Sequence, residues 1–526
     1  MSKQDDAGPD LAAGVPASEI AEGGLFAGHV GQEPVLITRI DSALHAIGAK
    51  CSHYGGPLAE GLVVGATVRC PWHHAQFCLK TGEAVGAPAF EPVKVWTVEE
   101  RDGSAFVHSA APRPANPTAH ETKRVVIIGG GAAGFAAAEL LRRKGFAGSM
   151  TILSADSEPP YDRPSCSKEY LEGKSTRDQT PLKAPSFYAA AGIDLRRSTQ
   201  VERIDPAAKT VSIKGDGERL VYDVLILATG AEPHRLSLPG LDGPGVFTLR
   251  TLTDADALIA AAQSARRAVV IGASFIGLEV AAALRQRGLE VTVVSPDTTP
   301  LEKILGREVG RWIQGVHEKE GVVFRLGHKV LGYADGKLAI EGGDPIPADL
   351  VMVGTGVKPR VDLAVAAGLK VDDGVVVDDR LRTSADAIYA AGDIARYPDP
   401  ISGRLIRVEH WVHAERQGQH LARLILGEDR PFTDPPFFWT KHYKRSVSYC
   451  GHAGDFDPPQ IDGSVEDGDA TIDYRENGRL TAVATIDRNL EGLQAEADFE
   501  PSSPHGPRPR FRPSREDLWS TSDRRG

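Results

Sequence analysis

Hydrophobic and polar positions change their period along the chain, which predicts several domains. Short alternating runs with glycine turns, such as 34–38 and 44–47, indicate an all-β domain over residues 18–109. Strand and helix patterns then alternate from residue 123 to about residue 430. That alternation is typical of layered α/β domains with parallel sheets.

The pattern returns to strands between residues 431 and 499, and Asn477-Gly478 predicts a two-residue hairpin turn there. Three further segments show neither period. Their composition predicts a flexible N-terminus over 1–17, a Pro/Ala-rich linker over 110–122 and a flexible Pro/Arg/Ser-rich tail over 500–526.

Composition narrows the class of protein. The chain has 526 residues, of which 41% are hydrophobic and 25% charged, so it is neither disordered nor fibrous. A net charge of −11 argues against a nucleic-acid partner. Five cysteines are too few for a disulfide framework and indicate a reducing compartment. The sequence shows neither a leader peptide nor an apolar run of about 20 residues, so we expect a cytoplasmic protein without a membrane partner.

Two short loops of the first domain each carry one cysteine and one histidine. Cys51 and His53 form the first pair, and Cys70 and His73 the second. Two cysteines on one iron and two histidines on the other make a Rieske [2Fe-2S] centre. A zinc ion also accepts two Cys and two His, but such sites usually pair Cys with Cys and His with His. Unrelated core residues are the third interpretation.

The loop sequences CSHYGGPL and CPWHHAQF resemble the two cluster-binding loops of Rieske proteins, over about residues 18–108. His74 stands where that family usually has glycine, which leaves open which histidine is the ligand; the spacing favours His73. Gly56 and Trp72 stand where high-potential members have a disulfide, so the resemblance implies the lower-potential, ferredoxin-type branch. We expect His53 and His73 at an exposed tip, as the electron exit.

Two glycine-rich motifs follow strand-like runs and precede helix-like runs. The first is Gly129-x-Gly131-x-x-Gly134, with Asp156 after the next strand as a candidate ribose acceptor. The second is Gly272-x-Ser274-x-x-Gly277, about 140 residues later. Backbone N–H groups and the helix dipole hold a pyrophosphate in such turns. Two copies therefore predict two dinucleotide sites.

The order of these motifs resembles the pyridine-nucleotide–disulfide oxidoreductase superfamily, in its ferredoxin-reductase and apoptosis-inducing-factor-like branch. The supporting strings are GASFIGLE, GTGVKP, AAGDIA, RVEHWVHAERQG and PPFFWT. The resemblance implies an FAD-binding domain over 123–245 and 380–430, interrupted by an NAD(P)-binding domain over 246–379. A C-terminal α+β domain like the reductase or dimerisation domain, over 431–499, completes the multidomain fold.

The resemblance also assigns residues. Lys168 and Glu279 are implied as catalytic, Lys168 beside the flavin ring and Glu279 beside the nicotinamide. Asp393, expected at a helix start, is implied to bind the ribityl chain, with Arg163 and Trp411 near the flavin. The remaining implied cofactor contacts are Thr229, Gly230, Gly356, Gly392, Glu409 and His410. Ser295 stands where NADH-preferring relatives have an acid that binds the ribose 2′-hydroxyl, and Asp297 is a candidate substitute. No arginine cluster for a 2′-phosphate follows. The sequence therefore favours NADH weakly and leaves NADPH open.

These features predict an enzyme that passes electrons from NAD(P)H through FAD to a Rieske [2Fe-2S] cluster and on to an acceptor. The acceptor is unknown, the candidates being an oxygenase, a cytochrome or a ferredoxin, and a homodimer is left open. One alternative is a redox-responsive binding protein whose reduced dimer is the signalling state. Another alternative is an NADH peroxidase or oxidase that depends on Cys166, whose thiol pKa the nearby Lys168 would lower. The plainer interpretation of Cys166 is a small buried side chain, and the same interpretation applies to Cys78 and Cys450.

Overall fold

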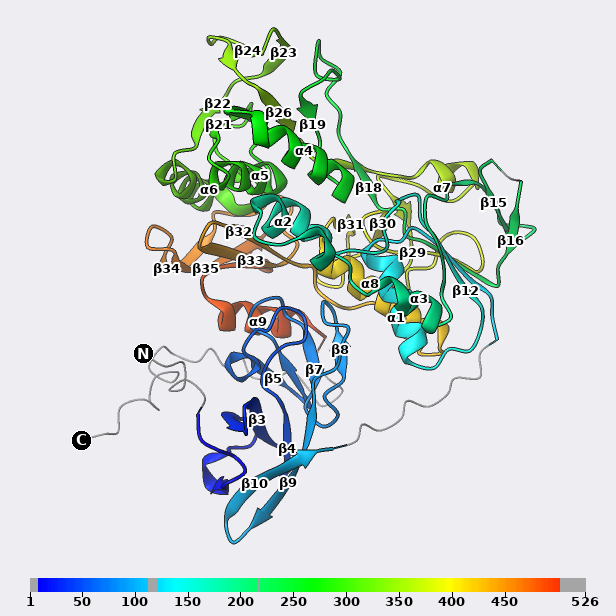
Figure 1. Ribbon diagram of the computed structural model, residues 1–526, viewed down its shortest axis with the longest axis vertical. Helices are drawn as coiled ribbons and strands as arrows, with labels where there is room; N and C mark the ends of the chain where they lie inside the picture. The colour runs from blue at the N-terminus through cyan, green and yellow to red at the C-terminus, as the bar shows by residue number, and fades with distance from the viewer. Residues whose placement is uncertain (1–7, 112–121, 216, 502–526) are drawn as a thin grey trace.

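The computed structural model describes residues 8–111, 122–215 and 217–501. The linker predicted over 110–122 and the tail predicted over 500–526 lie almost wholly outside these described residues. Three parts follow one another in Figure 1: a β domain at the bottom, two α/β layers above it, and a C-terminal sheet with a helix between them. None of the helices in the described part of the chain combines the length and hydrophobicity that a membrane span requires.

The β domain consists of two antiparallel sheets. The larger sheet has, in spatial order, β1 (Val15–Pro16), β10 (Ser104–Ala110), β9 (Val95–Arg101), β4 (Ala43–Gly48), β3 (Glu33–Ile40) and β2 (Leu25–Val30). The smaller sheet has β5 (Leu62–Val64), β6 (Thr67–Arg69), β7 (Gln76–Cys78) and β8 (Ala84–Gly86). Leu11 is fully buried in this domain, so the fold begins within the segment predicted to be a flexible N-terminus.

The first α/β layer is a parallel sheet whose strand order places the first glycine turn near its middle. Its strands are β13 (Asp194–Arg196), β12 (Met150–Leu153), β11 (Val125–Ile128), β17 (Val224–Leu227) and β29 (Ile388–Ala390). Helices α1 (Ala132–Arg143) and α8 (Trp411–Ile425) pack against each other beside it. Short elements complete this part: α3 (Pro185–Ala190), β14 (Val201–Asp205), β15 (Thr210–Ile213), β16 (Arg219–Val221), α7 (Asp362–Ala366), β28 (Val375–Val376), β30 (Ala395–Pro398) and β31 (Leu405–Arg407). Helix α2 (Glu169–Glu172) instead packs on the second layer, where Leu171 joins the core.

The second α/β layer repeats the arrangement. Its parallel sheet has β19 (Val246–Phe247), β26 (Leu350–Val353), β20 (Arg267–Ile271), β21 (Glu290–Ser295) and β22 (Val323–Leu326). Its helices are α4 (Leu252–Ser264), α5 (Phe275–Gln286) and α6 (Glu302–Lys319). An antiparallel sheet of β23 (Val330–Ala334), β24 (Lys337–Ile340) and β25 (Ile346–Pro347) lies at its outer end, and β18 (Ala231–Pro233) pairs with β27 (Val357–Pro359) between the layers.

The chain returns to the first layer earlier than the sequence predicts. Ala364, Leu369, Val375 and Val377 already lie in the core of that layer, before the predicted boundary at residue 380. The five-residue helix α7 and the two-residue strand β28 are too short to show a period that would mark the return.

The C-terminal part is an antiparallel sheet of β32 (Phe437–His442), β33 (Arg445–Gly451), β36 (Arg479–Ile486), β35 (Asp469–Glu476) and β34 (Gln460–Ser464). The predicted hairpin is confirmed, because Glu476 pairs with Arg479 and both Asn477 and Gly478 have positive φ. The strands end sooner than predicted, since α9 (Asn489–Phe499) is a helix. Figure 1 shows α9 between this sheet and the β domain.

Candidate functional site

A cavity of about 1550 Å³ lies between the two α/β layers and the C-terminal sheet. Pockets for one small molecule usually measure about 300–1000 Å³, so this cavity has room for more than one ligand. It brings together most of the predicted cofactor residues: Gly129, Gly131, Asp156, Arg163, Lys168, Thr229, Gly230, Ser274, Glu279, Gly356, Gly392, Asp393, Glu409, His410 and Trp411. Three predicted glycines, Gly134, Gly272 and Gly277, do not line the cavity.

The first glycine turn has the geometry of a pyrophosphate cradle. A Cβ on Gly129, whose φ is 113°, would lie 2.1 Å from the carbonyl oxygen of Ala228, and one on Gly134 would lie 2.0 Å from that of Gly129. Gly131 instead opens onto the cavity, where its nearest neighbour is an Arg163 nitrogen at 3.8 Å. Helix α1 begins at Ala132 without a side-chain cap, so its N-terminal N–H groups are free to bind a phosphate.

The second turn is packed in the same way but uses serine differently. A Cβ on Gly272 would lie 2.4 Å from the Gly354 carbonyl oxygen, and one on Gly277 would lie 2.2 Å from that of Gly272. Ser274 is the N-cap of α5: its hydroxyl accepts from the Gly277 N–H at 3.2 Å and donates to the Gly354 carbonyl at 2.7 Å. Serine at this position therefore caps helix α5, which a glycine side chain could not do.

Two predicted acids line the cavity and are held by neighbours. Asp156 accepts hydrogen bonds from the Tyr161 hydroxyl at 2.9 Å and from the Glu158 N–H at 3.1 Å. Asp393 binds Arg250 at 2.6 Å. The prediction that Asp393 stands at a helix start is wrong, because it lies in a turn before β30; the turn follows from Gly392, whose φ is 81°.

Lys168 and Glu279, predicted to be catalytic, form an ion pair at the cavity wall. The Lys168 ammonium lies 2.8 Å from Glu279 Oε2, and Glu279 is only 4% exposed. Glu279 also accepts from the Ser167 hydroxyl at 2.7 Å and from the Thr440 hydroxyl at 2.8 Å. The Glu279 carboxylate thus accepts from three donors, one of them charged.

The start of α8 brings further polar groups to the cavity. His410 is the N-cap residue and Trp411 the first helical residue. Within the described residues, His410 Nδ1 and His452 Nδ1 are buried in this wall without a hydrogen-bond partner. Buried orphaned nitrogens are rare in folded proteins, and here they fit a bound ligand with polar edges. The cavity, its open glycine turn and these nitrogens together fit FAD and a nicotinamide nucleotide.

Ser295 and Asp297 lie at the end of β21, where the second ribose is expected. Ser295 is 1% exposed, and its hydroxyl accepts from the Asp297 N–H at 3.2 Å. Lys303 lies 3.7 Å from Asp297. An acid and a base thus stand side by side, and the weak preference for NADH stays a prediction.

The two cysteine–histidine loops meet at one end of the β domain. Cys51 and His53 lie between β4 and β5, and Cys70 and His73 between β6 and β7. The Cys51 and Cys70 thiols are hydrogen-bonded, and backbone N–H groups point at both sulfurs. A Cβ on Gly56 would lie 2.7 Å from Cys70 Sγ, so glycine is needed there.

The directions of the imidazole rings distinguish His73 from His74 as the candidate ligand. His53 Nδ1 and His73 Nδ1 lie 3.2 Å apart, whereas His74 turns away, contacts Glu496 through Nδ1 and stacks on Phe437 with ring centroids 3.8 Å apart. His74 has a φ of 60°, the left-handed conformation for which glycine is usual. Among the described residues no three Cys, His, Asp or Glu converge on one metal position. Two pairs fit a two-iron cluster better than a zinc ion.

Trp439 connects this end of the β domain to the cavity, and sequence reasoning assigned it no role. Its ring centroid lies 4.3 Å from that of His73, and the same residue lines the cavity. The string PPFFWT drew attention to the segment, but only the structure shows what the tryptophan contacts. The expected exposed tip is wrong: His53 and His73 are half-buried and His73 contacts the reductase part.

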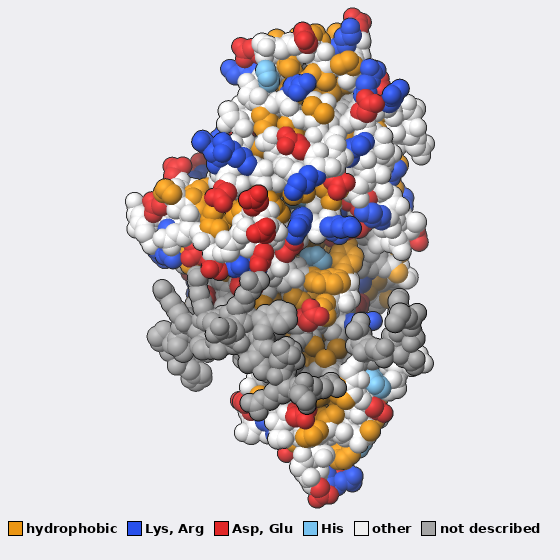
Figure 2. Space-filling view, turned by 90° about the vertical axis from the view of Figure 1, so that its left-hand side faces the viewer, with side chains coloured by type: hydrophobic (Ala, Val, Ile, Leu, Met, Phe, Trp, Pro, Cys, Tyr) orange, Lys and Arg blue, Asp and Glu red, His pale blue; other side chains and the backbone are white. Residues whose placement is uncertain are grey.

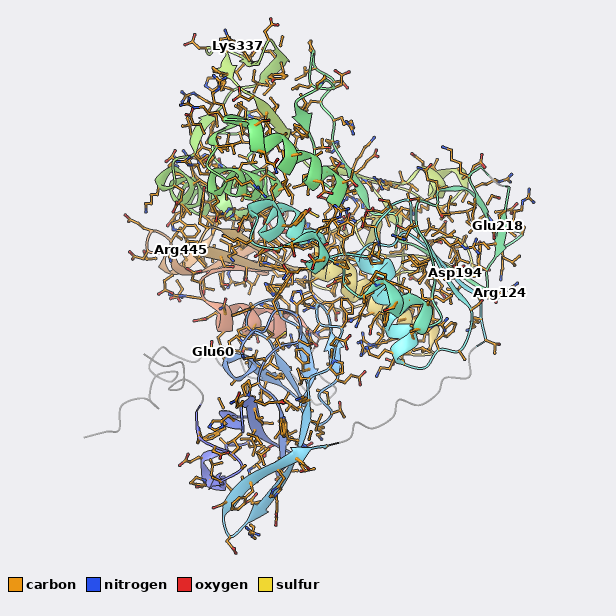
Figure 3. All side chains as sticks on the ribbon, viewed as in Figure 1. Glu60, Arg124, Asp194, Glu218, Lys337 and Arg445 are labelled. Carbon is orange, nitrogen blue, oxygen red and sulfur yellow. The ribbon has the colours of Figure 1, made fainter. Side chains whose placement is uncertain are left out.

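A buried ionic cluster fixes this arrangement. Glu496 of α9 contacts Arg416 of α8 as well as His74, and lies 3.7 Å from Arg69 of β6. Arg69 also binds Glu500 at 2.6 Å. Two further hydrogen bonds join the β domain to the reductase part: Gln419 accepts from the Ala87 N–H at 3.0 Å, and Tyr54 donates to Asp162 at 2.6 Å. Figure 3 labels Glu60, which lies on the side of the β domain that faces α9.

Cys166 lacks the surroundings of a reactive thiol. It is 2% exposed, and burial raises the pKa of its thiol to about 12. Lys168 is bound to Glu279 rather than directed at the sulfur. A protonated, enclosed thiol is a poor nucleophile.

We therefore expect Cys166→Ser to keep the NADH-dependent peroxide consumption of the wild type unchanged within about twofold, because the thiol stays protonated at neutral pH. The measurement is a coupled peroxide assay on both proteins at equal flavin content. A loss of most of the peroxide consumption in Cys166→Ser, with the flavin retained, would restore the peroxidase hypothesis.

Comparison with known proteins agrees with the geometry. Residues 123–418 match the family model "Pyridine nucleotide-disulphide oxidoreductase" and residues 12–97 match "Rieske [2Fe-2S] domain". Apoptosis-inducing factor 3 of Homo sapiens is 31% identical over 479 residues, which are 87% of this chain and 78% of that protein. Rhodocoxin reductase of Rhodococcus erythropolis is 39% identical over 376 residues, 70% of this chain and 88% of that protein.

A solved structure, the covalent putidaredoxin reductase–putidaredoxin complex, aligns with a TM-score of 0.69 at 33% identity and covers 72% of this chain and 93% of the matched chain. The human relative thus aligns with most of the chain, and the two reductases with about 70% of it. Together with the cavity and the cysteine–histidine loops, these matches show that the chain belongs to the pyridine nucleotide-disulphide oxidoreductase family, in its ferredoxin-reductase-like branch, and carries a Rieske [2Fe-2S] domain at its N-terminus.

Proposed function

We propose that this NAD(P)H oxidoreductase delivers its electrons first to its own Rieske domain, which then serves an external one-electron redox protein. The single observation that carries the proposal is Trp439, which lines the cavity and contacts His73. FAD, when bound, accepts a hydride from NAD(P)H and gives up electrons singly to an iron–sulfur centre.

The chain's own residues supply the positioning. The two glycine turns hold the dinucleotides, and the Lys168–Glu279 pair stands at the wall between them. Cys51, His53, Cys70 and His73 would hold the cluster, with Trp439 between the cluster and the cavity. The Rieske domain covers this edge of the reductase, which excludes water from the path and keeps a separate redox protein away from Trp439.

The side of the Rieske loops that stays open is the proposed exit. Trp72 and Tyr54, neighbours of the histidine ligands, are 44% and 52% exposed.

Charges of both signs are interspersed over the face shown in Figure 2, without a large basic area. All five cysteines are free, which supports work in a reducing compartment such as the cytoplasm.

The test is an anaerobic titration of the cluster-reconstituted protein with NADH, followed by visible absorption and low-temperature EPR. We expect the flavin absorption to bleach and a Rieske-type EPR signal to appear in the wild type. Trp439→Ala should bleach equally fast but gain the EPR signal at least about tenfold more slowly, because the contact that orders the path is lost. Trp439→Phe, which keeps an aromatic ring, is the matched control.

Bleaching of the flavin in the wild type with an EPR-silent but intact cluster would overturn the proposal. A change of molecular mass on addition of NADH, with the bleached state persisting for minutes, would instead support the redox-responsive binding protein.

A further inference from the structure

A buried hydrogen-bonded chain leads away from Glu279, through residues to which the proposed electron path gives no role. Thr440 donates to Glu279 Oε1 at 2.8 Å, and His442 Nε2 lies 3.3 Å from the Thr440 hydroxyl. His442 Nδ1 lies 3.0 Å from His317 Nε2. Thr440 is 1% exposed, and both histidines are fully buried. Three consecutive contacts therefore join the cavity wall to helix α6.

Strand β32 separates this series of hydrogen bonds from the proposed electron path. Successive side chains of a strand point to opposite faces. Phe437 and Trp439 face the Rieske domain, where they contact His74 and His73. Thr440 and His442 share the opposite face and reach Glu279 and His317.

The contacts fix the direction of every hydrogen bond. Because the Thr440 hydroxyl donates to Glu279, it accepts from the N–H at His442 Nε2; His442 Nδ1 then accepts from the N–H at His317 Nε2. His317 Nδ1 is left as a bare acceptor, and it has no partner among the described residues. With these tautomers, a single pass would carry a proton inward, from His317 Nδ1 to Glu279. The orientation is therefore the one left after a proton has passed outward, and Thr440 and both imidazoles must turn to the opposite orientation before the protonated Glu279 sends the next proton out.

Both histidines are suited to this because they stay neutral. Burial, reinforced by the Lys168 charge, lowers the pKa of His442 to about 3. Burial and His442 lower the pKa of His317 well below its ordinary value. A neutral imidazole carries one donor and one acceptor, as a relay requires.

The outer end of the chain lies just beneath the surface. His317 stands directly before Glu318, Lys319 and Glu320, which are all exposed at the end of α6. The Tyr443 ring lies 5.3 Å and the Phe324 ring 6.1 Å from the His317 ring. The charges around Tyr443 belong to Glu320, Arg285 and Glu172.

The chemistry of the proposed function creates a proton that has to leave. Oxidation of one NAD(P)H by two one-electron acceptors gives NAD(P)⁺, two reduced acceptors and one H⁺. An iron–sulfur centre takes up the electrons without the proton, so one proton must leave the enclosed cavity in each turnover. We propose that Glu279, Thr440, His442 and His317 conduct this proton from the cavity to the surface at the end of α6, a role that rests on the proposed function.

The first test measures proton release and cluster reduction separately in anaerobic stopped flow, with a pH-indicator dye and with the cluster absorption. In the wild type, we expect proton release to keep pace with cluster reduction. His442→Phe and Thr440→Val should slow proton release at least about tenfold and raise the solvent deuterium isotope effect, because they interrupt the chain. Thr440→Ser restores the hydroxyl, and the exposed His108→Gln is the surface control; both should behave as the wild type.

A second measurement needs neither cofactor nor turnover. ¹⁵N NMR of histidine-labelled apo-protein should show His317 and His442 neutral at pH 7, both protonated at Nε2, and Thr440→Val should shift the His442 resonances. The opposite tautomer at either residue would overturn the proposal. So would proton release of wild-type rate in His442→Phe with normal cluster reduction. Failure of the proposed function is distinct, because the wild-type cluster would then stay oxidised.

Discussion

Replacing His73 by alanine is expected to remove the Rieske EPR and visible spectrum, whereas replacing its neighbour His74 by asparagine is expected to leave the spectrum in place. His73 Nδ1 lies 3.2 Å from Nδ1 of His53, the histidine of the other loop, and Cys51 and Cys70 of the same two loops also contact each other. His74 points the other way, to Glu496 and Phe437. A cluster that loses one of its four ligands is not held, and its iron is lost on purification.

The choice of asparagine makes the comparison fair. Position 74 has a φ of 60°, and asparagine tolerates this conformation better than most residues. Iron content, EPR and flavin content are measured on both variants, the flavin serving as the control for folding. Retention of the signal in His73→Ala, or its loss in His74→Asn at wild-type flavin content, would contradict the assignment.

The local parts of this molecule could be predicted because local rules determine them. Gly129 and Gly134 have no space for a Cβ, so the sequence motif and the turn are one constraint. The Asn477-Gly478 hairpin likewise follows from two residues that tolerate positive φ. Strand–turn–helix order then predicted the doubly layered fold and both dinucleotide sites.

What could not be predicted depends on contacts between distant segments. Two adjacent histidines, His73 and His74, have the same chemistry, and the spacing alone only favours one of them. Their roles differ because Glu496, more than 400 residues later in the sequence, contacts the imidazole of His74. Trp439 gains its place in the same way, from a docked domain rather than from a period in its own strand. The exposed tip was expected from the Rieske domain considered by itself, without the surface that covers it.

The second large effect concerns the cluster of charges that holds the two parts together. Glu496 is fully buried, and although burial alone would raise its pKa, Arg416, His74 and Arg69 hold that pKa well below its usual range. Removing one partner of a buried ion pair costs about 3–5 kcal/mol, because the other charge stays buried without compensation. In Glu496→Gln, Arg416 loses the only carboxylate to which it is paired among the described residues.

We therefore expect Glu496→Gln to lower the free energy of unfolding by about 3–5 kcal/mol and to release the Rieske domain from Trp439. Chemical denaturation measures the first effect, and the rate of cluster reduction by NADH measures the second. Reduction of a small dye by the flavin should stay at the wild-type rate, since Glu496 lies outside the cavity lining. The matched control is Glu491→Gln, an exposed residue in the first turn of α9; a cost of at most about 1 kcal/mol is expected, because only its interaction with the helix N-terminus is lost. Equal costs in the two variants, or normal cluster reduction in Glu496→Gln, would show that apolar packing rather than this charge cluster holds the domain.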